Sequence, residues 1–348
     1  MAQEPEISQQ THRAGRKRRR WTMVLLATTV VAVVLGFPLA RFTVLRSDRE
    51  GLSATGGPPT GGPTIGTRSA TPATPLPVPS GAFAFVAGAL YPPAQIGIYR
   101  VSEDGTNLSI VVPKSSTTSV SWSPDGTKLA FSTGLSKGEG DLRIVNRDGT
   151  GEIVVSDFHE PHGMSWSPNG RVIAFTIGFA PFPYTIDPGD IYVIGVDGTG
   201  LTRLTHSGLP CSDLHAAWSP DGSELAFNRD CDPPSSIHVV NADGSDDRQI
   251  LAIRRTAQGI SWSPDGSLIA FSVIDPDRMM GIYTVAPDGG DLTMITEGFD
   301  VWPVWLSPEE LAFVRNGEIW EVDISTREAS RIVALPGLRV GPLSWLPG

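Results

Sequence analysis

The amino-acid sequence predicts an all-β fold: a six-bladed β-propeller closed by its C-terminal strand, preceded by one transmembrane helix and a disordered linker. Three observations predict the propeller. A hairpin motif recurs along most of the chain, each copy is followed by two further strand segments, and the last residues supply the one strand that the first unit lacks. Repeats of this kind indicate four-stranded blades arranged in a ring.

The repeated motif is a strand, a Ser-Pro-Asp-Gly turn and a second strand. Proline presets the first corner of a tight turn and glycine accepts its left-handed corner, so each copy predicts a hairpin. The copies read SWSPDGTKLAFST (121–133), SWSPNGRVIAFTI (165–177), AWSPDGSELAFNR (217–229), SWSPDGSLIAFSV (261–273) and, in a worn form, VWLSPEELAFVR (304–315). Their marker tryptophans stand 44, 52, 44 and 43 residues apart, near the period of about 40–45 residues for a propeller blade: Trp122, Trp166, Trp218, Trp262 and Trp305.

A third and a fourth strand follow each hairpin. The third strands read IGIYRV, GDLRIV, GDIYVI, SSIHVV, GIYTV and GEIWEV, which are rich in β-branched and aromatic residues. In five of the six units an Asp-Gly turn comes next, at 104–105, 148–149, 197–198, 243–244 and 288–289, before a short final strand. Each unit therefore supplies the four strands of one blade.

The two ends of the repeat region complete each other. The chain ends with SWLPG (344–348), a first strand with its marker Trp345, and the repeats begin with SGAFAFVAG (80–88), a second strand without a first. Pairing these segments restores one whole hairpin and removes the open sheet edges that would invite aggregation. We therefore expect a closed ring of six blades over residues 81–348.

An apolar segment before the repeats predicts a membrane anchor. Residues 21–40 carry no charge, and about 20 helical residues cover the hydrocarbon core of a bilayer. The basic run RKRRR (16–20) precedes it, so the positive-inside rule predicts a cytoplasmic tail (1–20), a single-pass signal-anchor helix (21–45) in the cytoplasmic membrane, and an extracytoplasmic propeller. A cleaved signal peptide is the alternative. Residues 46–80 are rich in Gly, Pro and Thr without apolar periodicity, which is typical of a linker.

The charge of the repeat region argues against nucleic acid as a partner. From Gly81 onward the chain carries 17 Lys and Arg against 33 Asp and Glu, and so acidic a body repels a phosphate backbone. The sequence contains no recognisable catalytic triad, phosphate loop or dinucleotide fingerprint. We therefore expect a binding or scaffolding module without a cofactor rather than an enzyme.

The hairpin [SA]WSPDGxxxAF, the strand GDIYVI and the turn DGTG together resemble the repeats of the TolB-like β-propeller family. The same repeat occurs in the propellers of dipeptidyl-peptidase-like and tricorn-like proteases. The resemblance covers about residues 81–348 and implies the fold. The proteases' hydrolase domain and the separate N-terminal domain of TolB have no counterpart in this sequence, so the resemblance alone does not imply their functions.

Loops that lead into the inner strands of a propeller gather on one face, around the mouth of its channel. Residues at these positions differ from unit to unit, as does the long segment 178–190, and loops on a rigid scaffold commonly carry recognition. We predict a protein or peptide partner at this mouth, with these candidate residues: His162, His215, Arg254, Arg255, Gln258, Asp300 and Trp302. Two alternatives stay open. The histidines could hold a metal for an extracytoplasmic lyase or hydrolase, or the loops could bind nothing.

Cys211 and Cys231 are the only cysteines. Cys211 stands before an inner strand and Cys231 after its hairpin partner, and an antiparallel hairpin returns the chain to where it began. An extracytoplasmic environment permits oxidation. We therefore predict a disulfide between them.

Overall fold

The computed structural model describes residues 81–89, 96–114, 117–134, 140–158, 161–177, 189–231, 234–254, 256–274 and 280–348. The predicted tail (1–20), anchor helix (21–45) and linker (46–80) lie outside these residues. The regular structure of the described part is entirely β-strand. No helix that could cross a membrane is found within it.

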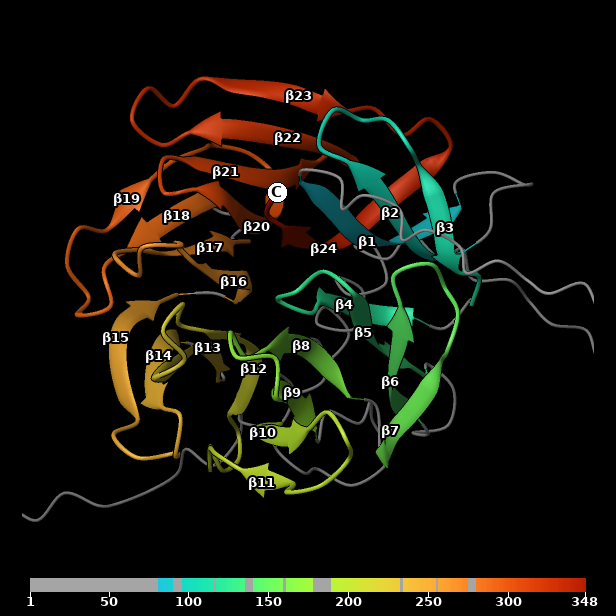
Figure 1. The fold of residues 1–348 in the computed structure, drawn as a ribbon. Helices are drawn as coiled ribbons and strands as arrows, with labels where there is room; N and C mark the ends of the chain where they lie inside the picture. The colour runs from blue at the N-terminus through green and yellow to red at the C-terminus, as the bar shows by residue number, and fades with distance from the viewer. Residues whose placement is uncertain are drawn as a thin grey trace, which may run out of the picture. The chain divides into compact units, whose positions relative to one another are not determined.

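Within these residues the strands form six sheets of four, arranged as blades around a centre (Figure 1). From the inside outward, blade 1 contains β24 (Leu338–Leu346), β1 (Ala82–Ala89), β2 (Gly97–Ser102) and β3 (Ser109–Val112). Blade 2 contains β4 (Thr117–Trp122), β5 (Lys128–Thr133), β6 (Gly140–Asn146) and β7 (Ile153–Phe158). Blade 3 contains β8 (His162–Trp166), β9 (Val172–Ile177), β10 (Asp190–Gly195) and β11 (Thr202–Arg203).

The remaining three blades repeat this order. Blade 4 contains β12 (Ser212–Trp218), β13 (Glu224–Asp230), β14 (Ser235–Asn241) and β15 (Arg248–Ile253). Blade 5 contains β16 (Ala257–Trp262), β17 (Ile269–Val273), β18 (Gly281–Val285) and β19 (Thr293–Met294). Blade 6 contains β20 (Asp300–Ser307), β21 (Glu310–Arg315), β22 (Glu318–Asp323) and β23 (Ala329–Val333). The predicted six-bladed propeller is confirmed.

The C-terminal strand closes the ring, as predicted. β24 is the innermost strand of blade 1 and pairs antiparallel with β1, from Ala82 opposite Leu346 to Ala89 opposite Leu338. Strands from the two ends of the repeat region thus share one sheet, and every blade has an inner strand.

Phenylalanine from the Ala-Phe part of the motif forms the centre of each blade. These side chains lie on the second strand and are at most 1% exposed: Phe83, Phe85, Phe131, Phe175, Phe227, Phe271 and Phe313. Each packs with aliphatic residues of its own and a neighbouring blade. Burial of one such side chain contributes about 1.5–3 kcal/mol, so this ring of contacts is a major stabilising feature of the fold.

The Ser-Trp pair of the motif joins neighbouring inner strands. The backbone N–H groups of Trp122, Trp166 and Trp218 donate to serine hydroxyls of the preceding blade, at 2.9, 3.3 and 3.4 Å: Ser344, Ser121 and Ser165. In blades 5 and 6 the indole N–H of the marker tryptophan donates instead to the preceding blade's backbone, at 3.1 Å: Trp262 to Ala217 and Trp305 to Ser261. The motif therefore encodes contacts between blades as well as the hairpin.

The Asp of the Ser-Pro-Asp-Gly turn is bound by the turn itself. In blade 4, the Oδ1 atom of Asp221 accepts hydrogen bonds from the Ser219 hydroxyl at 2.6 Å and from the Ser223 backbone N–H at 3.0 Å. These bonds favour the carboxylate and lower the pKa of Asp221 to about 2, with the Ser219 hydroxyl as the largest cause. Blade 3 carries Asn169 at the same place, with matching bonds from Ser167 and Arg171.

The ionisable Asp221, unlike Asn169, should make the stability of the folded protein depend on pH. The pKa of Asp221 falls from 3.8 to about 2 on folding, so its stabilising contribution is complete above the unfolded pKa and is lost as pH falls through the folded one. Asp221→Asn should keep the turn, as Asn169 does, but should remove this acid-dependent term. We measure the melting temperature of each protein by circular dichroism at about pH 5 and at about pH 2.5. The fall in melting temperature between these two pH values should be smaller in the variant than in the parent. An equal or larger difference in the variant would refute this role for the carboxylate.

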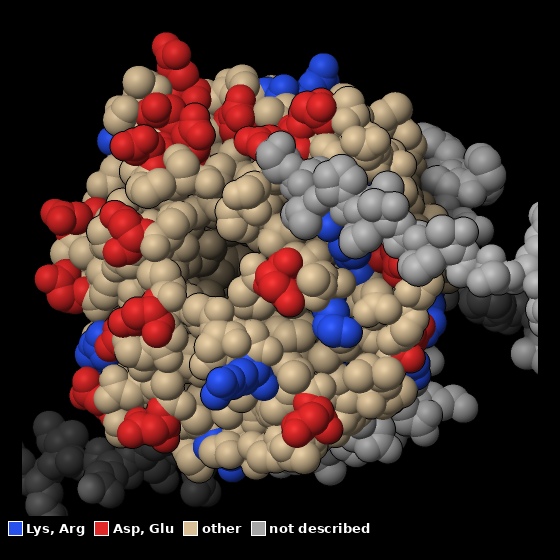
Figure 2. All heavy atoms as spheres, viewed as in Figure 1, with Lys and Arg blue, Asp and Glu red and all other residues tan. Residues whose placement is uncertain are grey.

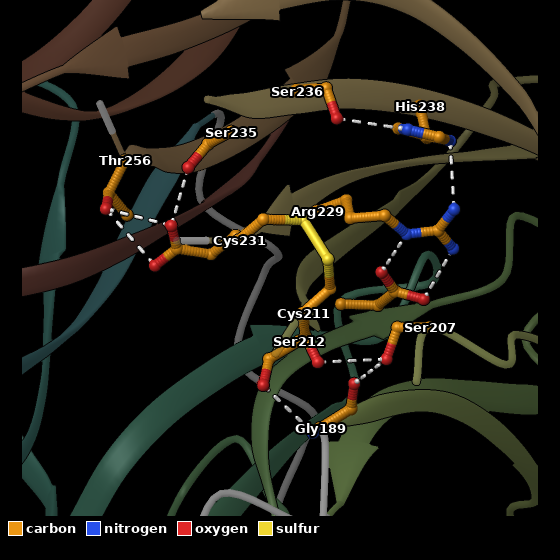
Figure 3. Close-up of a disulfide and its surroundings, with 12 residues drawn as sticks. Gly189, Ser207, Cys211, Ser212, Arg229, Cys231, Ser235, Ser236, His238 and Thr256 are labelled. Carbon is orange, nitrogen blue, oxygen red and sulfur yellow. Dashed lines mark hydrogen bonds and ion pairs between the residues drawn. A yellow bond between two sulfur atoms is a disulfide. The ribbon is translucent and has the colours of Figure 1, made fainter. Parts of the chain in front are cut away.

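The predicted disulfide joins Cys211 and Cys231 (Figure 3), with Cα atoms 4.1 Å apart. It lies beside the first pair of the β12–β13 ladder, Ser212 opposite Asp230. Hydrogen bonds also join Cys211 and Asp230, the neighbour of Cys231, to residues outside this hairpin. The Ser207 hydroxyl donates to the Cys211 carbonyl at 3.2 Å, and the Thr256 hydroxyl of the next blade donates to the Asp230 carboxylate at 3.1 Å. The disulfide thus ties the start of blade 4's inner strand to its neighbour.

Breaking this disulfide should destabilise the protein without changing the fold. In the chain-entropy model, closing a loop of this length stabilises the folded state by about 3 kcal/mol, because the cross-link restricts the unfolded chain. We expect Cys211→Ser with Cys231→Ser to lower the free energy of unfolding in urea by about that amount, with an unchanged circular dichroism spectrum. Addition of a reductant should lower the parent's stability similarly and leave the double variant unaffected.

Candidate functional site

The inner strands each carry a β-bulge near the end at which the chain enters them. The pairing register shifts between Thr117 and Val120 in β4, and at equivalent places in the other blades: 162–165 in β8, 214–217 in β12, 258–261 in β16 and 301–304 in β20. Bulges re-aim side chains and are common next to functional sites. The bulges place the candidate residues of blades 3 to 6 at one level of the ring.

Four bulges contain a residue with a left-handed backbone, three positions before the marker tryptophan. Two are glycines, Gly163 (φ 62°) and Gly259 (φ 60°), which adopt this conformation without strain. The other two are bulky, His215 (φ 58°) and Trp302 (φ 59°). A left-handed backbone at such residues costs on the order of 1 kcal/mol and is commonest at functional sites. Blades 4 and 6 therefore maintain a strain that blades 3 and 5 avoid.

The two strained residues meet. The rings of His215 and Trp302 lie edge to face with centroids 5.5 Å apart, although blade 5 stands between their blades. The glycines make room for them. A Cβ atom on Gly163 would stand 3.1 Å from the Cα atom of His215, and one on Gly259 would stand 2.7 Å from the Cα atom of Trp302. Glycine in one blade thus allows the large residue of the next to approach.

The His215 side chain is held neutral. Burial, the larger cause, and the nearby His162 together lower its pKa from 6.5 to about 4. The imidazole is therefore uncharged at neutral pH, where it can act as a hydrogen-bond donor and acceptor. His162 and His215, predicted separately from their loops, are neighbours in the structure.

Gln258 adds a polar group to this level of the ring. It occupies the same position in blade 5 as His162 in blade 3, four residues before the marker tryptophan, and the Ser272 hydroxyl donates to its backbone carbonyl at 2.6 Å. Its side-chain Oε1 atom is buried and has no hydrogen-bond partner within the described part of the protein. A buried acceptor without a donor is costly, so it is suited to a ligand's N–H or O–H group. We call His162, His215, Gln258 and Trp302 the entry mouth.

Asp300, another of the predicted mouth residues, forms a buried ion pair. It is 1% exposed, and its carboxylate accepts hydrogen bonds at 2.7 and 2.6 Å from the Nε and Nη2 atoms of Arg315. Asp213 and Arg229 form the same pair in blade 4, at 2.7 and 2.9 Å. Each aspartate lies two residues before a strained ring residue. Asp300 therefore positions the strand that carries Trp302, and Arg315 engages both of its carboxylate oxygens.

The remaining candidates are less informative. Arg254 is exposed in the loop between β15 and β16. Arg255 and residues 178–188 lie outside the described residues. The sequence reasoning missed Gly163 and Gly259, whose signal was present as a glycine three residues before the marker tryptophan in two units.

The histidines of the entry mouth do not form a metal-binding cluster with other described residues. Among the described residues, no three His, Cys, Asp or Glu side chains come together in a way that could hold a metal ion. His159, which stands three residues before His162, is outside the described residues.

Comparisons with known proteins agree with the fold. A family model described as the TolB beta propeller domain matches residues 84–347. The structure of TolB from Acinetobacter baumannii is similar at a TM-score of 0.64 and 17% identity, covering 77% of this chain and 67% of that one. A chain of a nidogen/laminin complex is similar at a TM-score of 0.62 and 13% identity, covering 76% of this chain and 98% of that one. No curated protein matches the sequence.

Proposed function

Because the chain belongs to the TolB β-propeller family, we propose that it is a non-catalytic binding or scaffolding module, anchored in the cytoplasmic membrane, that recognises a protein or peptide with its entry mouth. The observation that carries the proposal is the contact between His215 and Trp302, two strained rings at 5.5 Å from blades that are not adjacent. Strain of this kind persists in proteins mainly where function requires the side chain.

The chemistry of the entry mouth suits a polypeptide. It combines an indole, a neutral imidazole and an amide oxygen that has no hydrogen-bond partner among the described residues. Aromatic residues are the usual anchors of protein interfaces, and an unpaired acceptor is suited to a backbone N–H of the partner. The nidogen/laminin structure, a complex of two proteins, is compatible with this use of the fold.

The start of the propeller lies away from the entry mouth. Gly81 precedes Ala82, which pairs with Leu346 at the end of β24, and Leu346 packs against Gly126 of a Ser-Pro-Asp-Gly turn. These turns follow the inner strands at the ends opposite the bulges. Gly81, the first described residue, therefore lies at the end of blade 1 that is opposite the bulges.

The orientation can be tested with a reporter. Fused after Gly348, alkaline phosphatase, which requires an extracytoplasmic environment, should be active, and a cytoplasmic reporter should be silent. Replacing the RKRRR run (16–20) by neutral residues should reduce this asymmetry, because the positive-inside bias is then lost. A signal from the cytoplasmic reporter in the parent protein would overturn the proposed orientation.

Binding can be tested by crosslinking in intact membranes with the tagged full-length chain as bait. The expected result is one or a few proteins recovered with the parent and lost with Trp302→Gly. Recovery of the same proteins with both chains would contradict binding at the entry mouth.

A further inference from the structure

Asn228, in β13 of blade 4, is a fully buried side chain without a hydrogen-bond partner. It is 0% exposed, and among the described residues neither its Oδ1 nor its Nδ2 atom has a partner. Leaving both ends of a buried amide unpaired destabilises the folded state, and few native side chains do so. Such a residue is expected where another conformation of the protein provides the amide with a hydrogen bond.

In the other five blades the equivalent residue is either hydrogen-bonded or apolar. The equivalence is set by the ladder, since each residue stands three positions after the one that pairs with the marker tryptophan. Blades 1 and 6 carry Val86 and Val314. Blades 2, 3 and 5 carry a hydroxyl that bonds to an inner strand at 2.7, 3.2 and 2.6 Å: Ser132 to the Thr118 hydroxyl, Thr176 to the Asp213 carbonyl and Ser272 to the Gln258 carbonyl.

Asn228 also stands beside the strained bulge of blade 4. It pairs with Leu214, and His215, the next residue, has the left-handed backbone (φ 58°). The peptide plane between Leu214 and His215 carries the Leu214 carbonyl, and the φ angle of His215 helps to set its orientation. Rotation of this plane therefore relieves the left-handed backbone and re-aims a carbonyl oxygen beside the unpaired amide in one movement.

The alternative backbone is already present in blade 2. Ser119 occupies the His215 position there, three residues before the marker tryptophan, and its backbone is not left-handed. The pairing register of this bulge nevertheless shifts as it does in blade 4. Blade 6 is the opposite case, because Val314 offers no polar group beside the strained Trp302. Among the described bulges, blade 4 alone combines a strained ring residue with an unpaired amide.

The conformation of this bulge affects the opening of the channel. The ring of blades is hollowed at its centre (Figure 2), and the channel is lined by Trp302 and by Ala216, the residue after His215. The His215 ring lies 5.5 Å from that of Trp302. Rotation of the peptide plane before His215 therefore changes the entry mouth and the channel lining together.

We propose that the bulge of blade 4 is a two-state switch controlled by Asn228. In the strained state, which the structure shows, His215 contacts Trp302 and the amide is unpaired. In the released state the peptide plane between Leu214 and His215 has rotated, and the amide is hydrogen-bonded to the bulge. The effect on a partner rests on the proposed function. A partner that contacts both rings selects the strained state, and the released fraction reduces its apparent affinity.

NMR of the histidines tests the switch on the full-length chain without a partner. The chain has six histidines, so ¹³C labelling at histidine Cε1 gives few signals in dodecyl maltoside micelles, and the signal lost in His215→Gly belongs to His215. We expect this signal to show two states, as separate peaks or as relaxation dispersion, because the Trp302 ring shifts only one of them. A single His215 signal without exchange would overturn the proposal. Failure of partner capture alone would contradict only the proposed function.

Asn228→Val makes the test specific, because it gives blade 4 the residue that blade 6 carries as Val314. It removes the hydrogen bond of the released state, so the released fraction should fall at least about fivefold, and the melting temperature should rise because an unpaired amide is lost. The matched control, Ser132→Val, removes a bonded hydroxyl and should lower the melting temperature without changing the His215 signal. An unchanged released fraction in Asn228→Val would overturn the role of the amide. Should this variant not fold, the signal of the parent still decides whether two states exist.

Discussion

Deleting residues 340–348 should abolish folding or lower the melting temperature drastically, although only nine residues are lost. The deletion removes most of β24, the inner strand of blade 1, and with it four largely buried side chains: Val340, Leu343, Trp345 and Leu346. At about 1.5–3 kcal/mol for each buried side chain, this loss matches the whole stability of a typical domain, about 5–15 kcal/mol. It also leaves the hydrogen-bonding edge of β1 open to aggregation.

The matched control is a deletion of 51–75, which removes more residues from the predicted linker. The melting temperature, measured by circular dichroism or differential scanning calorimetry, should then stay within a few degrees of the parent. Similar behaviour of the two deletions would contradict closure of the ring by β24 as a main source of stability.

Replacing a strained ring residue by glycine should separate binding from stability. His215→Gly and Trp302→Gly place at these bulges the residue that blades 3 and 5 carry as Gly163 and Gly259. Glycine relieves about 1 kcal/mol of backbone strain, which offsets part of the lost ring contact. Removing an aromatic anchor costs about 2 kcal/mol or more of binding energy. We therefore expect partner capture to fall at least about tenfold while the melting temperature changes little.

The control pair is Asp148→Asn with Asp243→Asn, in the outer Asp-Gly turns. Each side chain accepts a hydrogen bond from the backbone two residues on, Thr150 and Ser245, which asparagine can also accept. Capture should be nearly unchanged in this pair. Loss of capture here, with retention in the glycine variants, would place the binding surface on another part of the propeller.

The fold could be predicted from the sequence because the information is local and repeated. The Ser-Pro-Asp-Gly turn, the buried phenylalanine and the marker tryptophan each act within one blade or on its neighbour, so their periodicity, together with the two incomplete units at the ends, predicted the number of blades. The pairing of β24 with β1 followed from two incomplete units, and the disulfide followed from the geometry of one hairpin. The prediction of a membrane anchor rests on the hydropathy and charge of residues 16–40, and it stays a prediction.

The candidate site was harder to predict, because it depends on contacts between blades. The loop positions indicated His162, His215, Gln258 and Trp302, but nothing in the spacing indicated that two rings meet across blade 5 or that both have a left-handed backbone. Asp300 looked like a loop acid, and only its partner Arg315, fifteen residues away in the hairpin, reveals a structural carboxylate. Burial and pairing are tertiary properties that a local pattern does not contain.

Site-specific photocrosslinking in intact membranes tests the central claim most directly. A photoreactive phenylalanine analogue is placed at position 302 in one full-length chain and at position 148, in an outer turn, in another. A partner held at the entry mouth should give a defined crosslinked band from position 302 and none from position 148, and His215→Gly should reduce the first. A band from position 148 alone would contradict recognition at the entry mouth.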